Sequence, residues 1–220
     1  MIDESKILEF LNRNSEFDSA HDLQHIRRVV GNARKLLESE PANPLVVITA
    51  AWLHDCINVP KDSPDRKKAS LMSADAAIEF LRDSDFSDQV LEQIHHAIHA
   101  HSYSAAIPCK TIEAQLVQDA DRLDALGAVG LARCFSIGGL LNLDFYQPED
   151  PFCENRMPDD QRFVIDHFFE KLLRLPETMQ TESGRAEARK RAQFLETYLD
   201  QLRLELPSNS EFQESAPGIG

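Results

Sequence analysis

The sequence predicts an all-α protein, folded as a bundle of helices, and two observations support this fold class. Apolar residues recur three and four positions apart, as in Ile7, Phe10 and Leu11, which is the spacing of an amphipathic helix. No segment shows a convincing alternation of apolar and polar residues, as a half-buried strand would require. Helices are therefore expected wherever the apolar residues are periodic.

The helices are expected between breaks rich in proline, glycine or polar residues. After the first helix, the period resumes from Ile26 to Leu37, and the apolar run 46–53 indicates a further, buried helix. Later helices follow the same periodic pattern, and those of the C-terminal part are expected at 159–206. The breaks themselves fall at 41–44, 59–64, 83–87, 104–110 and 147–158.

The chain length favours one large domain. With 220 residues, it exceeds the usual size of about 150 residues per domain only modestly and can bury a substantial core. We expect a single domain at 1–206, with core motifs in 21–125 and the C-terminal helices packed on them. Four phenylalanines are expected in the core, namely Phe163, Phe168, Phe169 and Phe194. Residues 207–220 are polar with Gly and Pro, which is typical of a flexible tail.

The composition excludes several classes of partner. A net charge of -14 argues against a nucleic-acid polymer as the main ligand, because backbone binding needs a face rich in Lys and Arg. No segment approaches the roughly 20 apolar residues of a membrane span, and the acidic start is unlike a secretory signal. The four cysteines form no Cys-x-x-Cys pair and are expected to be reduced. We expect a cytoplasmic protein, monomeric or homodimeric, without a membrane partner.

The most informative chemical feature is the adjacent pair His54 and Asp55, which follows the apolar run 46–53. Neighbouring residues project about 100° apart on a helix, so both reach one cation only where the helix ends or bends. The residues after the pair lead into Pro60, which indicates such an ending. His25 on an upstream helix and the carboxylates at 119–124 complete the order His, His-Asp, Asp.

This order, with its flanking residues, resembles the HD superfamily of metal-dependent phosphohydrolases. The stretches 21–29, 51–55 and 118–128 are also similar to a bacterial subgroup of that superfamily, the YedJ type, and the likeness spans about residues 5–205. The resemblance implies an HD-type helical bundle with a single divalent metal ion between its helices. The implied metal ligands are His25, His54, Asp55 and Asp121.

The metal and the fourth ligand stay open to alternatives. Two imidazoles and two carboxylates suit Mn, Mg, Fe, Co, Ni or Zn, so the ligands do not name the ion. Asp119 and Asp124 compete with Asp121, and Asp121 is preferred because it precedes Arg-Leu as the metal-binding Asp of the family does. Asp22 is a candidate for an acceptor that fixes the tautomer of a ligand imidazole.

Substrate contacts are expected in the segment after the His-Asp pair, at His101 and in the C-terminal part of the chain. The resemblance implies that His101 lies near the site, as a catalytic or substrate contact. Lys61 and Arg66 match the subgroup around Pro64 and are expected to hold phosphate. In the C-terminal part, two further cations are candidates for contacts to a phosphate or a base, although surface pairing and helix packing explain them nearly as well. They are Lys171 and Arg185.

The general base is the least certain assignment. Asp55 is expected at the reacting centre, and Asp62 and Asp65 are candidates to orient the attacking water. Asn58 stands where some HD hydrolases carry a carboxylate.

The resemblance implies hydrolysis of a phosphate ester or anhydride, most plausibly of a nucleotide, by water activated on the metal. Release of a monophosphate and release of pyrophosphate from a triphosphate both remain open. One alternative is a metal-dependent nucleotide sensor without turnover. Another is a binuclear HD-type oxygenase, because His95 and His99 share a helix face and could bind a second metal.

Overall fold

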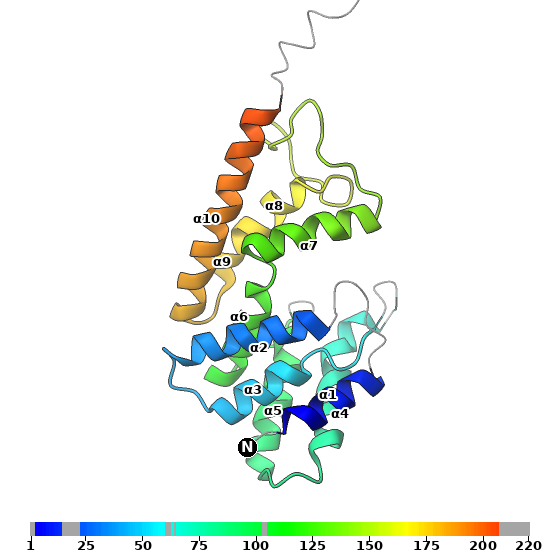
Figure 1. Ribbon diagram of the computed structural model, residues 1–220, viewed down its shortest axis with the longest axis vertical. Coiled ribbons are helices and arrows are strands. Elements are labelled where there is room, and N and C mark those ends of the chain that lie inside the picture. Colours follow the sequence, from blue (N-terminus) through cyan, green and yellow to red (C-terminus); the bar gives the residue numbers. More distant parts are fainter. Residues whose placement is uncertain (1–2, 15–22, 60–62, 64, 103–104, 207–220) are drawn as a thin grey trace, which may run out of the picture.

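The structure is a computed structural model that describes residues 3–14, 23–59, 63, 65–102 and 105–206 (Figure 1). Within these residues the secondary structure is helical, which confirms the predicted class, and the only β-type pairing is an isolated parallel bridge between Asp144 and Phe163. The elements are α1 (Glu4–Asn14), α2 (Leu23–Leu37), α3 (Pro44–Leu53), η1 (Arg66–Lys68), α4 (Ala69–Leu81), α5 (Asp88–His101), α6 (Ile112–Leu123), α7 (Gly127–Leu140), α8 (Asp166–Glu170), η3 (Leu172–Arg174), α9 (Leu175–Thr178) and α10 (Glu182–Glu205).

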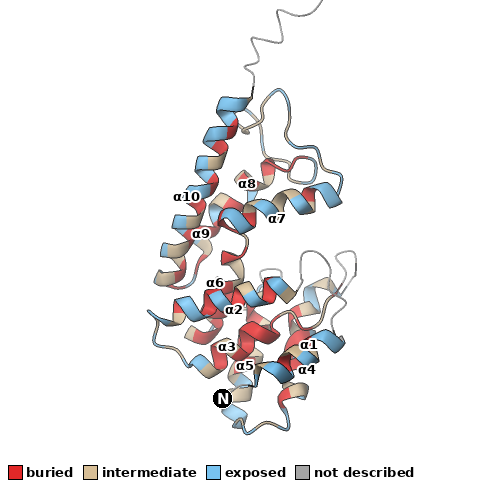
Figure 2. Ribbon diagram, viewed as in Figure 1, coloured by how far each residue is buried: buried red, intermediate tan, exposed pale blue. Residues whose placement is uncertain are grey.

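The helix α3 lies at the centre of the first group of helices, α1 to α6. It packs against α2, α5 and α6, and all its residues from Val46 to Leu53 except Ile48 are buried (Figure 2). A helix that is apolar all round is stable only when other elements surround it. Its start is fixed by Asn43, whose side chain accepts a hydrogen bond from the Leu45 amide at 3.0 Å, as an N-cap residue does.

The helices α7 to α10 form a second group, which adjoins the first through α6 (Figure 1). The long helix α10 packs against α6, α7 and α9. The loop from α7 to α8 lies close to α7, because a Cβ atom on Gly138 would lie 2.3 Å from Cγ2 of Val164. A side chain at Gly138 would therefore separate the two segments.

Two predictions about the C-terminal part need correction. Residues 159–165 contain no helix but turns on either side of the bridge residue Phe163, and helical structure begins only at Asp166. Phe194 is 47 % exposed and lies outside the core, because the buried face of α10 is formed by a different set of positions. These are Gly184, Ala188, Ala192, Leu195, Leu199 and Leu202. The predicted tail 207–220 lies outside the described residues.

Among the described residues, no single helix is long and apolar enough to cross a membrane. The pair α6 and α7 reaches the required length and composition only when both helices are taken together, and the chain bends by 63° between them.

Candidate metal centre

The pair His54 and Asp55 lies where α3 ends, as its position after an apolar run predicted. The last helical residue is Leu53, and His54 keeps helical dihedral angles as the C-cap, with φ −58° and ψ −35°. Asp55 follows in a turn. The end of the helix brings the two side chains together, with His54 Nε2 3.7 Å from Asp55 Oδ2.

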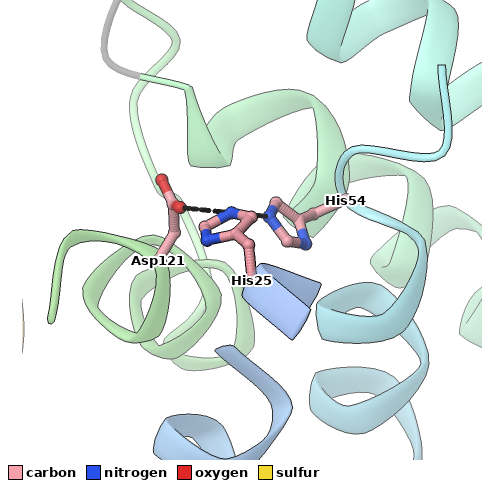
Figure 3. A group of neighbouring side chains, drawn as sticks. All are labelled: His25, His54 and Asp121. Carbon is pink, nitrogen blue, oxygen red and sulfur yellow. Dashed lines mark hydrogen bonds and ion pairs between the residues drawn. The ribbon is translucent and has the colours of Figure 1, made fainter. Parts of the chain in front are cut away.

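Three side chains from different helices converge beside this turn (Figure 3). His25 belongs to α2 and Asp121 to α6. The Nε2 atom of His25 lies 3.3 Å from Nε2 of His54 and 3.4 Å from Oδ1 of Asp121. The His54 Nε2 atom lies 3.9 Å from the same Asp121 oxygen. These three ligand atoms lie within 4.8 Å of one another and could hold a metal ion.

Asp55 lies between this group and His101. One carboxylate oxygen, Oδ2, is 3.9 Å from His25 Nε2, and the other, Oδ1, is 3.4 Å from His101 Nε2. His101 is the last residue of α5, and its Nδ1–H donates to the Ile98 carbonyl at 2.6 Å. His54, Asp55 and His101 form a second group with the spacing of metal ligands.

The tautomers of the two central histidines indicate a cation. His54 Nδ1–H donates to the Ala51 carbonyl at 2.8 Å, and His25 Nδ1–H donates to Asp124 Oδ2 at 2.7 Å. Each Nε2 atom then carries a lone pair, and the two lone pairs face each other at 3.3 Å. Acceptor atoms that converge in this way repel one another unless a positive ion lies between them. The donor set therefore fits a divalent metal.

Asp124 supports His25 and is not placed as a ligand. Its buried carboxylate accepts a hydrogen bond from Arg28 Nε at 2.6 Å and also contacts Arg133. Burial opposes ionisation, but the hydrogen bonds from His25 and Arg28 outweigh it and hold the pKa of Asp124 well below its usual range. Arg133 Nη1 also lies 2.8 Å from His25 Nδ1. The ionised carboxylate of Asp124 only accepts, so its 2.7 Å contact with Nδ1 requires the imidazole proton to lie between these two atoms.

Sequence reasoning missed this role of Asp124, for which Asp22 was the candidate. Asp22 lies outside the described residues. A signal was present, because Asp124 follows Asp121 by three positions and residues with that spacing share a helix face. Asp119 is 160° away from Asp121 around an ideal helix, and it forms hydrogen bonds with Gln180 and Thr181 instead. Asp119, which was considered as an alternative to Asp121, therefore does not join the group of candidate ligands.

Burial and the charge of Asp55 have opposite effects on the pKa values of the two histidines beside it, His54 and His101. Burial lowers the pKa of His54 to about 4, despite the nearby charge of Asp55. Burial also opposes protonation of His101, but the hydrogen bond and the charge of Asp55 outweigh it and raise the pKa of His101. In the absence of a metal ion, His54 is therefore neutral near pH 7, as a metal ligand must be.

The histidine and carboxylate groups line one end of a cleft of about 810 Å³. The cleft is also lined by residues in α8, η3 and α9 and by Lys171 between α8 and η3. We call this set the C-terminal wall: Glu170, Lys171, Arg174, Leu175 and Thr178. Further residues that line the cleft include Asn58, Arg66, Ser70, Arg122, Arg133 and Asp160. Five of the lining side chains are Lys or Arg and five are Asp or Glu. Because two of these carboxylates belong to the candidate metal ligands, a bound divalent ion would leave the cleft net positive and able to accept an anion, although the whole protein is acidic.

The structure brings some of the predicted substrate residues to this cleft and leaves others away from it. Arg66, His101 and Lys171 line it. Asp65 is bonded to Lys68 Nζ at 2.9 Å and does not line it. Arg185 also lies away from the lining residues, and its Nη2 donates to the Met179 carbonyl at 2.8 Å. Two other predicted residues, Lys61 and Asp62, lie outside the described residues.

The histidines proposed for a second metal do not join the centre. His95 Nε2 lies 2.9 Å from Asp75 Oδ1, and the rings of His95 and His99 are 6.1 Å apart between centroids. Among the described residues, neither His95 nor His99 belongs to a group with metal-ligand spacing.

Comparison with known proteins agrees with this geometry. The family model of the HD domain matches residues 22–126. YpgQ, an uncharacterized protein of Bacillus subtilis (strain 168), is 34% identical over 190 residues, which cover 86% of each chain.

Two solved structures are similar over most of the chain. YpgQ of Bacillus subtilis in complex with ADP has a TM-score of 0.70 and 33% identity, covering 92% of this chain and 98% of YpgQ. An HD-superfamily hydrolase of Bacillus thuringiensis has a TM-score of 0.69 and 30% identity, covering 92% of this chain and 97% of the hydrolase. The YedJ-type subgroup stays a prediction. Motifs, fold and relatives together show that the chain belongs to the HD-domain family, the metal-dependent hydrolases of the HD superfamily.

Proposed function

We propose that this protein hydrolyses a phosphate ester or anhydride bond of a nucleotide, with one divalent metal ion held by His25, His54, Asp55 and Asp121. The observation that carries the proposal is the convergence of two imidazole lone pairs and two carboxylates in a cleft that is also lined by five Lys and Arg side chains. The similarity to YpgQ, which was solved in complex with ADP, supports a nucleotide as the ligand.

A divalent metal at this site would lower the pKa of water and polarise a phosphoryl oxygen. The residues of the chain orient the substrate around it. His25 and His54 have their Nδ1 protons fixed by Asp124 and by the Ala51 carbonyl, so their Nε2 atoms stay directed at the site. His101 Nε2 lies 3.4 Å from Asp55 on the cleft side. In the imidazolium form, which the raised pKa of His101 favours, Nε2 also carries a proton and can donate a hydrogen bond to a phosphoryl oxygen or to the leaving group.

The size and charge of the cleft support a phosphorylated small molecule. Its volume of about 810 Å³ lies in the usual range for ligand pockets, about 300–1,000 Å³. Arg66 on one side and Lys171 with Arg174 on the C-terminal wall can form charge-assisted hydrogen bonds with phosphate oxygens. A nucleoside di- or triphosphate would use both sides at once.

A nucleotide sensor without turnover is the second candidate, because the expected general base lacks support. Asn58 lines the cleft where a carboxylate was sought, and Asp65 is directed at Lys68. A sensor would bind metal and nucleotide through the same residues but would release no product.

Product release distinguishes the two functions. Phosphate and pyrophosphate would be measured with nucleoside mono-, di- and triphosphates and with Mn, Mg, Co or Ni, in the wild type and in Asp55→Ala. A matched control is Asp75→Ala, which removes an exposed carboxylate that pairs with His95. Turnover that needs metal, survives in the control and disappears in Asp55→Ala supports the hydrolase. Metal-loaded protein that binds nucleotides without releasing product supports the sensor.

A further inference from the structure

Asp119 is a buried carboxylate that the proposed chemistry does not use. It is fully buried on α6, two residues before Asp121. It accepts three hydrogen bonds, each of 2.8 Å, from the Gln180 amide, the Thr181 amide and the Thr181 hydroxyl. A buried carboxylate is stable only when such donors compensate for the loss of water. Its donors all come from the turn that precedes α10.

The same turn has further bonds that fix its shape. Arg122 of α6 donates to the Thr178 carbonyl, and Arg185 Nη2 donates to the Met179 carbonyl at 2.8 Å. The Thr181 hydroxyl also accepts from the Gly184 amide at 3.0 Å, as the N-cap of α10. Residues 178–181 are therefore attached to α6 through several hydrogen bonds, with the carboxylate of Asp119 as the central acceptor.

Gly184 leaves the space that this attachment requires. A Cβ atom at this position would lie 2.3 Å from Asp119 Oδ2 and 2.8 Å from the Thr181 hydroxyl oxygen. Any other residue would push the start of α10 away from α6 or displace the carboxylate. The contact between Asp119 and the turn can thus be disturbed in two independent ways, by a substitution at Asp119 or by one at Gly184.

The turn continues directly from the C-terminal wall of the cleft. The wall consists of short helices, with 5 residues in α8, 3 in η3 and 4 in α9. Helices of this length are not stable by themselves, so their positions depend on tertiary contacts. Because Thr178 lines the cleft and is bonded to Arg122, the attachment at 178–181 holds the end of the wall nearest α6.

The helix α6 carries both the attachment and a proposed metal ligand. Two residues correspond to about 200° of rotation and about 3 Å of rise, so Asp121 faces the metal group while Asp119 faces the turn. Because both side chains belong to the same regular helix, the distance between the metal ligands and the wall is set by α6. A helix is stiff over such a short separation.

We propose that Asp119 is a positioning residue that fixes the phosphate-binding wall, with Lys171 and Arg174, at its working distance from the metal centre. The inference rests on the proposed function in that the wall binds the phosphates of a nucleotide. Loss of the Asp119 contact weakens nucleotide binding while the metal ligands stay in place.

The test compares Asp119→Asn, Gly184→Ala and the double variant with the wild type. Gly31→Ala is the matched control, since a Cβ atom there meets nothing within 4 Å. Metal affinity is measured by calorimetric titration with Mn, and ADP affinity is measured on the metal-loaded protein, together with kcat and KM for turnover. Circular dichroism establishes that each variant is folded.

Each single variant is expected to weaken ADP binding and raise KM by about fivefold to thirtyfold, because the contacts of two partly solvated cations, Lys171 and Arg174, are weakened together. Metal affinity is expected to stay within about twofold of the wild type. The double variant is expected to be no worse than the stronger single variant, because both disturb one contact. Gly31→Ala is expected to bind ADP normally.

Three outcomes overturn the inference. They are unchanged ADP affinity in a folded variant, an equal loss of metal affinity, and additive effects in the double variant. If Asp119→Asn does not fold, the ADP and metal affinities of Gly184→Ala alone test the inference. A wild type that binds ADP without turnover refutes the hydrolase but leaves the positioning role measurable through ADP affinity. A metal-loaded wild type that does not bind ADP refutes the nucleotide wall and with it this role of Asp119.

Discussion

The two sides of the cleft are built on different physical principles. On the metal side, His25, His54 and His101 are 3%, 0% and 5% exposed, and they lie in or at the ends of helices of 10 to 15 residues. On the C-terminal wall, Lys171 and Arg174 are exposed and lie in or beside helical segments of 3 to 5 residues. Core packing thus holds the geometry of the proposed metal ligands, whereas the placement of the cations on the wall depends on a few tertiary hydrogen bonds.

The largest difference between the two sides is expected when one carboxylate on each is neutralised without a change of shape. Asp121→Asn removes a proposed metal ligand and is expected to reduce kcat/KM roughly a thousandfold, since metal catalysis supplies several kcal/mol. Glu170→Gln, on the C-terminal wall, is expected to change kcat/KM less than about tenfold. Steady-state kinetics with saturating Mn provide the measurement. Equal losses of kcat/KM in both variants would contradict the expected difference between the metal side and the C-terminal wall.

A pH titration of stability should also distinguish the buried side. The pKa of His54 is lowered by burial to about 4 from 6.5, so between these values the unfolded chain binds a proton that the folded protein does not. Stability of the metal-free protein is therefore expected to fall as the pH decreases from about 6.5 to 4, by about 3 kcal/mol.

Urea unfolding with a chelator present, at pH 7, 5.5 and 4, tests this expectation. His54→Gln should lose this part of the pH dependence, whereas His95→Gln, at a partly exposed position, should retain it. If the free energy of unfolding depends on pH in the same way in the wild type and in His54→Gln, burial of His54 does not have the expected effect.

The support of His25 by Asp124 is expected to have an intermediate effect. Asp124→Asn keeps the shape but weakens the acceptor that holds the Nδ1–H of His25, and loss of such a partner typically reduces metal affinity about 10- to 100-fold. Isothermal titration with Mn measures the affinity. Excess Mn should restore most of the kcat, which separates this variant from Asp121→Asn; a failure of excess Mn to do so would indicate that Asp124 is itself a ligand.

The smallest effect is expected on the C-terminal wall. Lys171→Met removes one exposed cation and is expected to raise KM about fivefold at low salt, because a partly solvated charge contact contributes about 1 kcal/mol. Metal affinity and kcat should change little, and the difference in KM should shrink as salt increases. Lys190→Met, which alters an exposed lysine of α10 outside the cleft, is the control and should leave KM unchanged.

Much of the metal side could be predicted from sequence because its signals are local. The apolar run 46–53 followed by His54 and Asp55 indicated a buried helix with ligands at its end, and α3 ends at Leu53. The resemblance of the motifs to a known family then supplied His25 and Asp121. The assignment of these four residues as ligands remains a prediction, which the convergence of their side chains supports.

The C-terminal wall was harder to predict because its contacts join residues far apart in the chain. Arg185 was a candidate for substrate binding, yet it donates to Met179 in the turn before α10. The pairing of Asp119 with Gln180 and Thr181 spans about 60 positions, and no local pattern indicates it. Phe194 was expected in the core, but α10 buries a different face.

By itself, the sequence determined the helical class, the end of α3 at the His-Asp pair and the family of the chain, because periodicity and motif spacing are properties of neighbouring residues. Only the tertiary structure showed what each of the three carboxylates in and directly after α6 contacts. Asp121 faces His25 and His54, Asp124 holds the far side of His25, and Asp119 holds the turn before α10. The physical reason is that the role of a carboxylate depends on the donors that packing brings to it, and these donors come from distant helices.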